Sequence, residues 1–333
     1  MIYKDIELFN VEDIREGSGG AVLYRFPIDV TEQMGRCEYN KRIARLTTGI
    51  EMRFVGEAFI TLRVLDWYGF VTVYLGDRQM SVHQVRKNEL LTLELGCGDN
   101  GCYDTSRTPH GRFAPNVWRV VIGHDIRVRI VEIEPFGEIR PPKPDELPKT
   151  TMLAYGSSIT HGTGAIMYEN AYIVKTAEAL GIQVLNKGMG GSCHCEKAVA
   201  NYIASADADI LCLELGINML DVFSPDEYRE RAGYLLKKAA ATSKPVIFVS
   251  TLFGSAGVCT DKQRTEKYRA YEAVAEELAK ETGVNFIKGS DILRNHTELT
   301  GDMIHPSVHG HDLMAKRLSK RLSAILNFPL INP

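Results

Sequence analysis

Apolar and polar residues alternate through much of the first 140 residues. The run from Ile126 to Ile133 alternates almost throughout, which is typical of a strand with one buried face. Similar short runs, separated by Gly, Asp and Asn, cover residues 21–26, 52–55, 58–67, 70–75, 90–95 and 117–122. No stretch in this part shows a convincing helical period. The pattern predicts an all-β, jelly-roll-like sandwich over residues 1–140.

The pattern changes after a short charged stretch that holds four prolines, residues 138–148. Proline cannot continue a helix or a central strand, so residues 141–149 are predicted to form a stiff, Pro-rich linker. Beyond it, apolar strands are expected at residues 151–155, 183–186, 209–215, 245–250 and 284–287. Helices are expected at residues 170–180, 195–204, 225–241, 261–281 and 307–326. This alternation predicts a flavodoxin-like, doubly wound parallel sheet over residues 150–333.

Composition narrows the classes of function. The formal net charge of -3 disfavours nucleic acid or an anionic membrane as a partner, since both attract an excess of Lys and Arg. The chain shows neither a signal peptide nor an apolar run near the ~20 residues that span a bilayer. Its seven scattered cysteines do not resemble the framework of a small secreted domain. We therefore expect a cytoplasmic protein.

Polar residues follow the predicted strands of the second half. Ser157 and Ser158 stand in a Gly-bounded turn after the first strand, and three glycines follow Asn186 after the second. Glycines let a substrate approach backbone N–H groups. Each motif taken alone is also an ordinary turn.

Two further strand ends complete this pattern. Asn218 follows the third strand and can offer a side-chain N–H to an oxyanion. Asp302 and His305 follow the fifth strand, three residues apart, so the carboxylate can orient the imidazole. Parallel strands place their carboxyl ends at one edge of the sheet. A nucleophile, oxyanion donors and an oriented base at that edge predict acyl transfer.

These segments resemble the four sequence blocks of the GDSL/SGNH hydrolases. The blocks are Gly156-Ser157-Ser158-Ile159-Thr160, Asn186 through Gly191, Gly216-Ile217-Asn218 and Asp302-Met303-Ile304-His305. The resemblance implies that Ser158 is the nucleophile, His305 the base and Asp302 its orienting acid. It also implies an oxyanion hole made by the backbone N–H groups of Ser158 and Gly191 and by the side chain of Asn218, with no metal and no cofactor.

Two positions depart from the family pattern. Ser157 stands where the family often has Asp, and as a second serine in the turn it is a rival nucleophile. Met219 stands where an Asp often follows the Asn of the third block. An N-terminal sandwich before such a domain resembles the two-domain carbohydrate esterases. The resemblance therefore implies a serine ester hydrolase that deacetylates O-acetylated saccharides or similar small esters. A short-chain lipase or thioesterase, or an inactive carbohydrate-binding protein, is the alternative.

Other candidate residues receive structural interpretations. Cys193, His194 and Cys195 lie too close together to surround one Zn²⁺, so we expect a pocket wall or no role there. His309 and His311 are interpreted as helix-start residues. Most aromatic residues of the first domain are expected in its core, although a sugar-binding face stays open: Trp67, Tyr68, Tyr74, Tyr103 and Trp118. A homo-oligomer also stays open.

Overall fold

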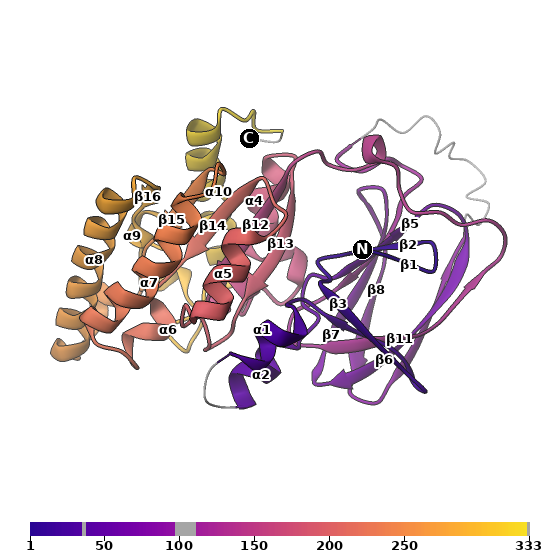
Figure 1. Ribbon diagram of the computed structural model, residues 1–333, viewed down its shortest axis with the longest axis horizontal. Helices are drawn as coiled ribbons and strands as arrows, with labels where there is room; N and C mark the ends of the chain where they lie inside the picture. The colour runs from indigo at the N-terminus through magenta and orange to yellow at the C-terminus, as the bar shows by residue number, and fades with distance from the viewer. Residues whose placement is uncertain (35–37, 97–110, 332–333) are drawn as a thin grey trace. The chain divides into compact units, whose positions relative to one another are not determined.

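The computed structural model describes residues 1–34, 38–96 and 111–331 (Figure 1). Its contacts divide the chain into two compact units. Unit 1 comprises residues 1–31 and 44–149, and unit 2 comprises residues 32–43 and 150–333.

Unit 1 consists of two antiparallel sheets. The first has the order β1-β2-β5-β10-β7-β8, from strands Ile2–Tyr3, Ile6–Phe9, Glu51–Phe54, Trp118–Ile122, Tyr68–Leu75 and Arg78–Arg86. The second has the order β3-β4-β11-β6-β9, from Asp13–Gly17, Gly20–Tyr24, Arg127–Pro135, Ala58–Asp66 and Leu90–Leu95. The predicted β-sandwich is confirmed.

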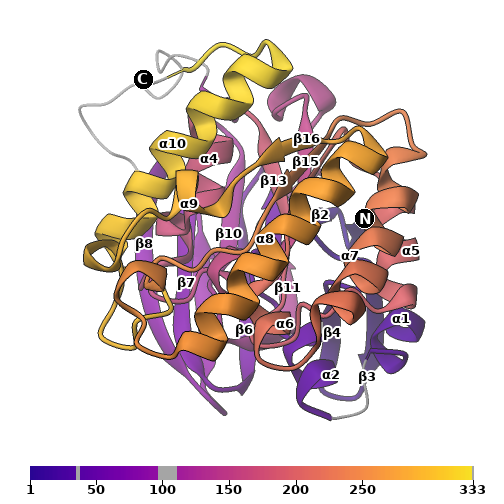
Figure 2. The same cartoon turned by 90° about the vertical axis from the view of Figure 1, so that its left-hand side faces the viewer.

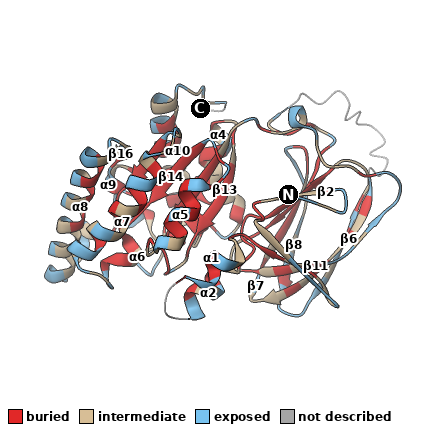
Figure 3. Ribbon diagram, viewed as in Figure 1, coloured by how far each residue is buried: buried red, intermediate tan, exposed pale blue. Residues whose placement is uncertain are grey.

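Alternation along the strands builds the core of unit 1 (Figure 3). In β6 every second residue from Ala58 to Val64 is buried, and the residues between them are partly exposed. The buried residues join one apolar cluster with residues of the other sheet, including Trp118. Core packing is therefore the role of Trp118, as expected, whereas Tyr68 is largely exposed. Tyr103 lies outside the described residues.

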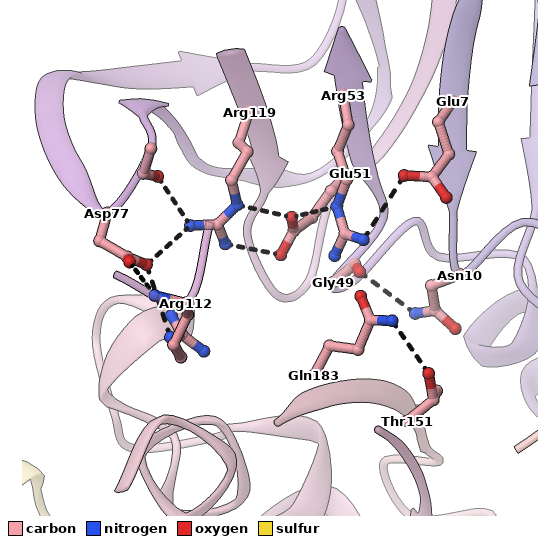
Figure 4. Close-up of polar contacts among 11 residues, drawn as sticks. Glu7, Asn10, Gly49, Glu51, Arg53, Asp77, Arg112, Arg119, Thr151 and Gln183 are labelled. Atoms are coloured by element: carbon pink, nitrogen blue, oxygen red, sulfur yellow. Dashed lines mark hydrogen bonds and ion pairs between the residues drawn. The ribbon is translucent and has the colours of Figure 1, made fainter. Parts of the chain in front are cut away.

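A charged network lies within the first sheet of unit 1 (Figure 4). The Glu51 carboxylate accepts hydrogen bonds from Arg53 Nε at 2.8 Å and from Arg119 Nε and Nη2, both at 3.0 Å. The Arg53 guanidinium also stacks 3.8 Å from the Phe9 ring centre. All three charged residues are buried. Burial opposes ionisation of Glu51, but the two guanidinium groups outweigh it and hold its pKa well below the usual range.

Unit 1 holds elements that the apolar pattern does not predict. Strands β1 and β2 span only two and four residues, too few for a clear pattern, and β3 and β8 lie largely exposed, so their side chains alternate only weakly. Helices α1, Ile28–Glu32, and α2, Glu38–Ala44, span five and seven residues, too few to display a helical period.

The division into units differs from the predicted domains at two places. Residues 32–43 fall inside the predicted sandwich domain but group with unit 2, because α2 contacts the loop after β13. The Pro-rich stretch is held on unit 1 rather than free. Glu146 pairs with both terminal nitrogens of Arg140 at 2.7 Å, and its carbonyl accepts from the Ala114 N–H.

Unit 2 contains a five-stranded parallel sheet of order β13-β12-β14-β15-β16. In chain order the strands are β12 Thr151–Gly156, β13 Gln183–Gly188, β14 Ile210–Glu214, β15 Val246–Val249 and β16 Asn285–Ile287. The first strand pairs with the second and third, which is the flavodoxin-like order 2-1-3-4-5. The predicted fold of this half is confirmed.

Helices cover both faces of this sheet (Figure 2). On one face α4, Tyr172–Ala179, packs against α10, Val308–Leu326; on the other α7, Pro225–Ala240, packs against α5, Lys197–Ser205, and α8, Lys262–Thr282. Short helices follow β12 (α3, Ser158–His161), β14 (α6, Ile217–Leu220) and β16 (α9, Gly289–Ile292). None of the helices within the described residues is both long enough and apolar enough to cross a bilayer.

Candidate active site

Ser158 is presented by a tight turn between β12 and α3. Ser157 caps α3, its hydroxyl accepting the Ile159 N–H at 3.1 Å. Gly156 is required before it, since a Cβ there would stand 2.3 Å from Thr160 Oγ1. The turn leaves Ser158 only 8% exposed, at the carboxyl end of the first strand, where the sequence predicts it.

The structure brings Ser158 together with His305 and Asp302. The His305 Nε2 atom lies 2.8 Å from Ser158 Oγ, across 147 residues of sequence. On the other side of the ring, His305 Nδ1 lies 2.6 Å from Asp302 Oδ2. With Nδ1 protonated toward the carboxylate, Nε2 is free to accept the Ser158 proton, which is the arrangement of an acid–base–nucleophile triad.

The turn that carries His305 also fixes Asp302. The second oxygen of Asp302 accepts from the backbone N–H groups of Ile304 and His305 and from the Thr300 hydroxyl, each at 2.9 Å. Met303 adopts a left-handed conformation between them, with φ 62°. Burial raises the pKa of Asp302, but the bonds from His305 and Ile304 prevail and hold it well below its usual range. The carboxylate therefore stays ionised beside the imidazole.

The predicted oxyanion donors follow three neighbouring strands, β12, β13 and β14. Within the described part of the chain, neither the Ser158 nor the Gly191 backbone N–H donates to a protein acceptor. A Cβ on Gly190 would stand 3.8 Å from the Ser158 Cβ, so the glycine loop passes beside the nucleophile. Asn218 Oδ1 accepts the Cys193 N–H at 3.1 Å, which orients its amide and leaves the NH₂ group as the available end.

A buried carboxylate beneath this turn is a site residue that the sequence analysis missed. Glu214 Oε2 accepts the backbone N–H and the hydroxyl of Ser157, both at 2.7 Å, and the Thr160 hydroxyl at 3.1 Å. Burial raises the pKa of Glu214 to about 7, although these bonds lower it. Glu214 is the one charged residue in an otherwise apolar strand, which was the available signal.

The same contacts separate the two candidate serines. The Ser157 hydroxyl donates to Glu214 and is 1% exposed, whereas the Ser158 hydroxyl meets His305. The geometry therefore favours Ser158 over its rival as the nucleophile.

Residues 32–43 add a second contribution that the sequence did not predict. The Ser192 hydroxyl donates to Asn40 Oδ1 at 3.0 Å, so α2 is held on the glycine loop. The neighbouring Tyr39 ring lies over Gly191, where an added Cβ would stand 3.3 Å from its Cε1 atom. Tyr39 is 50% exposed. An aromatic surface thus borders the oxyanion loop within unit 2.

The side chains of the remaining candidates take no part in this constellation. Cys193 and Cys195 are buried thiols, and within the described residues no group of three or more His, Cys, Asp or Glu could hold a metal. His311 accepts the Tyr172 N–H through Nδ1 at 3.1 Å and lies 3.1 Å from the Thr163 carbonyl oxygen through Nε2. It is a buried structural residue, and His309 is exposed.

Comparisons with known proteins bear on the family and the fold of the chain. Residues 154–313 match the model of the GDSL-like Lipase/Acylhydrolase family. No curated protein matches the chain.

Solved structures share the fold of both units. A salicylyl-acyltransferase from a tetracycline biosynthetic pathway is similar with a TM-score of 0.81 and 13% identity, covering 98% of this chain and 96% of that one. A family two carbohydrate esterase from Cellvibrio japonicus gives 0.61 and 14%, covering 97% and 96%. An acetyl xylan esterase from Butyrivibrio proteoclasticus gives 0.58 and 14%, covering 98% and 96%.

The family resemblance expected from the four sequence blocks is therefore confirmed. The matched segment contains all four blocks, and the solved structures share the fold over nearly the whole of this chain. Together these findings show that unit 2 resembles the GDSL-like Lipase/Acylhydrolase family over residues 154–313 and that the chain shares its fold with the solved structures.

Proposed function

We propose that this protein is a serine esterase that removes acetyl or similarly short acyl groups from hydroxyls of saccharides. The observation that carries the proposal is the line of contacts from Asp302 through His305 to Ser158, with distances of 2.6 Å and 2.8 Å. These distances suit proton transfer without rearrangement of the loops.

In the proposed mechanism, His305 Nε2 takes the Ser158 hydroxyl proton while Oγ attacks the ester carbonyl carbon. The resulting oxyanion accepts hydrogen bonds from the backbone N–H groups of Ser158 and Gly191 and from the Asn218 amide. The imidazolium gives its proton to the alcohol oxygen as the C–O bond breaks, leaving an acyl-enzyme. Water then attacks that ester with His305 again as base, and Ser158 regains its proton.

Asp302 acts on this cycle through His305. Its ionised carboxylate keeps the Nδ1 proton in place and stabilises the imidazolium that forms twice in each turnover. The three bonds to its other oxygen keep the carboxylate from rotating away.

A saccharide is the favoured alcohol for two reasons. The structural relatives include a family two carbohydrate esterase and an acetyl xylan esterase. In addition, the half-exposed Tyr39 ring beside Gly191 offers a flat apolar surface of the kind on which sugar rings stack. The Tyr39 surface gives no such support to the alternative of a short-chain lipase or thioesterase.

The serine mechanism is tested with Ser158→Ala and His305→Ala, measured on p-nitrophenyl acetate. Both are expected to lower kcat by at least about 10⁴-fold, as for other triads whose members act as a unit. Ser205→Ala, which removes an exposed hydroxyl at the end of α5, is the matched control and should keep full activity. Mass spectrometry of the protein mixed with substrate should find the acetyl group on Ser158. An active Ser158→Ala variant would disprove the assignment.

The substrate class is tested with acetylated mono- and oligosaccharides beside p-nitrophenyl esters of rising chain length. Higher kcat/KM on acetylated sugars than on simple acetyl esters supports the proposal. A preference for long acyl chains or for thioesters supports the alternative instead.

A further inference from the structure

A cavity of about 470 Å³ lies on the outward face of the second sheet of unit 1. It is lined by the turn at residues 18–20, by Arg63, Asn88 and Arg129, and by two aliphatic side chains. Arg63 and Arg129 are the partly exposed residues between buried neighbours on β6 and β11, so both point away from the core. None of these residues belongs to the candidate active site.

The two arginines face each other directly across the strands. Arg129 on β11 is the register partner of Arg63 on β6. Directly opposed residues place their Cβ atoms about 5 Å apart, and like charges in such pairs are destabilising. No aspartate or glutamate is among the residues that line the cavity. The lining of the cavity thus carries two positive charges and no carboxylate.

The hydrogen-bonding capacity of the pair is largely unused. Arg63 Nη1 donates to the Asn88 carbonyl at 3.3 Å. The Arg129 side chain makes no hydrogen bond or ion pair with any other described residue, and its Nε atom is buried. A guanidinium carries five N–H donors, and a buried donor without an acceptor is costly. An acceptor from outside the protein would satisfy these donors.

The turn beside the pair is shaped to admit the Arg129 guanidinium. A Cβ on Gly19 would stand 2.2 Å from Arg129 Nη1. At Gly20 the backbone has φ 109°, and a Cβ would stand 2.1 Å from the Ile130 carbonyl oxygen. Two glycines in succession therefore seat the guanidinium against the turn and hold it at the cavity wall.

We propose that this cavity binds an anionic small molecule through a carboxylate or phosphate group held by Arg63 and Arg129. Planar guanidinium forks match both oxyanions with paired hydrogen bonds. The volume exceeds the space of one oxyanion and falls within the range of ~300–1,000 Å³ found for small-molecule sites. A sugar acid or a sugar phosphate fits this chemistry, with Asn88 and the turn beside its neutral part.

The test measures binding of glucuronate, glucose 6-phosphate and neutral glucose to the full chain by isothermal titration calorimetry at constant ionic strength. The variants are Arg129→Gln and Arg63→Gln. Arg78→Gln removes the same charge from an exposed position on β8, in the other sheet, and serves as the control. Circular dichroism and p-nitrophenyl acetate hydrolysis verify that each variant is folded.

Saturable binding of at least one anionic sugar is expected, weakened about tenfold or more by either cavity substitution and unchanged in Arg78→Gln. The identity of the bound sugar distinguishes a carboxylate from a phosphate ligand. Without ligand at low salt, Arg129→Gln should unfold at the same temperature as the wild type or above it, because the opposed charges are gone. Equal binding of glucose, or anion binding that persists in both cavity variants, would overturn the proposal. So would the absence of saturable binding.

Discussion

Asn218 shows how one side chain is prepared for a transition state before substrate arrives. The Cys193 N–H occupies its carbonyl oxygen and so directs the amide NH₂ toward the available position. We expect Asn218→Ala to lower kcat on acetyl esters by about 10²–10³-fold with a small change in KM, since the bond matters when negative charge develops.

Steady-state kinetics on acetyl esters measure kcat and KM of Asn218→Ala. Asn201→Ala, at an exposed residue of α5, is the control. Unchanged turnover in Asn218→Ala would remove the residue from the oxyanion hole.

Glu214 makes the stability of the fold depend on pH. Its pKa is about 7 when folded, against an ordinary 4.5. Between these values the folded state binds more protons than the unfolded state, so the free energy of unfolding falls as pH rises from about 4.5 to about 7. The full effect is on the order of 3 kcal/mol.

Chemical denaturation across this pH range should show a smaller loss in Glu214→Gln than in the wild type. Glu230→Gln, an exposed residue of α7, is the control and should behave like the wild type. Partly buried Glu272, whose pKa is also raised, titrates in both proteins, so the difference between the two proteins isolates Glu214. Parallel curves for wild type and Glu214→Gln would contradict the raised pKa.

At the scale of elements, the short helix α2 contributes an aromatic residue to the surroundings of the candidate active site. It lies in the sequence of the sandwich but groups with unit 2, where it brings Tyr39 to the glycine loop. We expect Tyr39→Ala to raise KM for an acetylated sugar about tenfold, because loss of an aromatic contact costs roughly 1.4 kcal/mol.

Hydrolysis of p-nitrophenyl acetate should change little in Tyr39→Ala, and Tyr39→Phe should keep activity on both substrates. Tyr68→Ala alters an exposed tyrosine of unit 1 as control. An equal loss on both substrates would assign Tyr39 to the loop's conformation rather than to sugar binding.

At the scale of the whole molecule, the two units have separate apolar cores. Glu51 lies in the first unit, where its carboxylate pairs with both Arg53 and Arg119 (Figure 4). Removal of one partner from a buried charge network costs about 3–5 kcal/mol. We expect Glu51→Ala to lower the temperature of one calorimetric transition and to leave the transition of unit 2 in place.

Differential scanning calorimetry measures the two transitions, and esterase activity is followed during the same heating. Glu134→Ala, at an exposed residue of β11, is the control. A single transition that shifts as a whole would show that the units unfold together.

The sequence by itself determined the flavodoxin-like parallel sheet and the order of the site motifs along the chain. Apolar strands that alternate with helices and Gly-rich strand ends are local signals, and a parallel sheet brings the carboxyl ends of its strands to one edge. The identities of Ser158, Asn218, Asp302 and His305 as candidates followed from these signals.

Only the tertiary structure decided which serine meets His305, how Glu214 sits beneath the turn, and that residues 32–43 join unit 2. It also decided that Arg63 and Arg129 become partners. Each of these features depends on contacts between residues far apart in the chain. The pattern of neighbouring residues determines neither the direction in which a side chain points nor the register in which two distant strands pair.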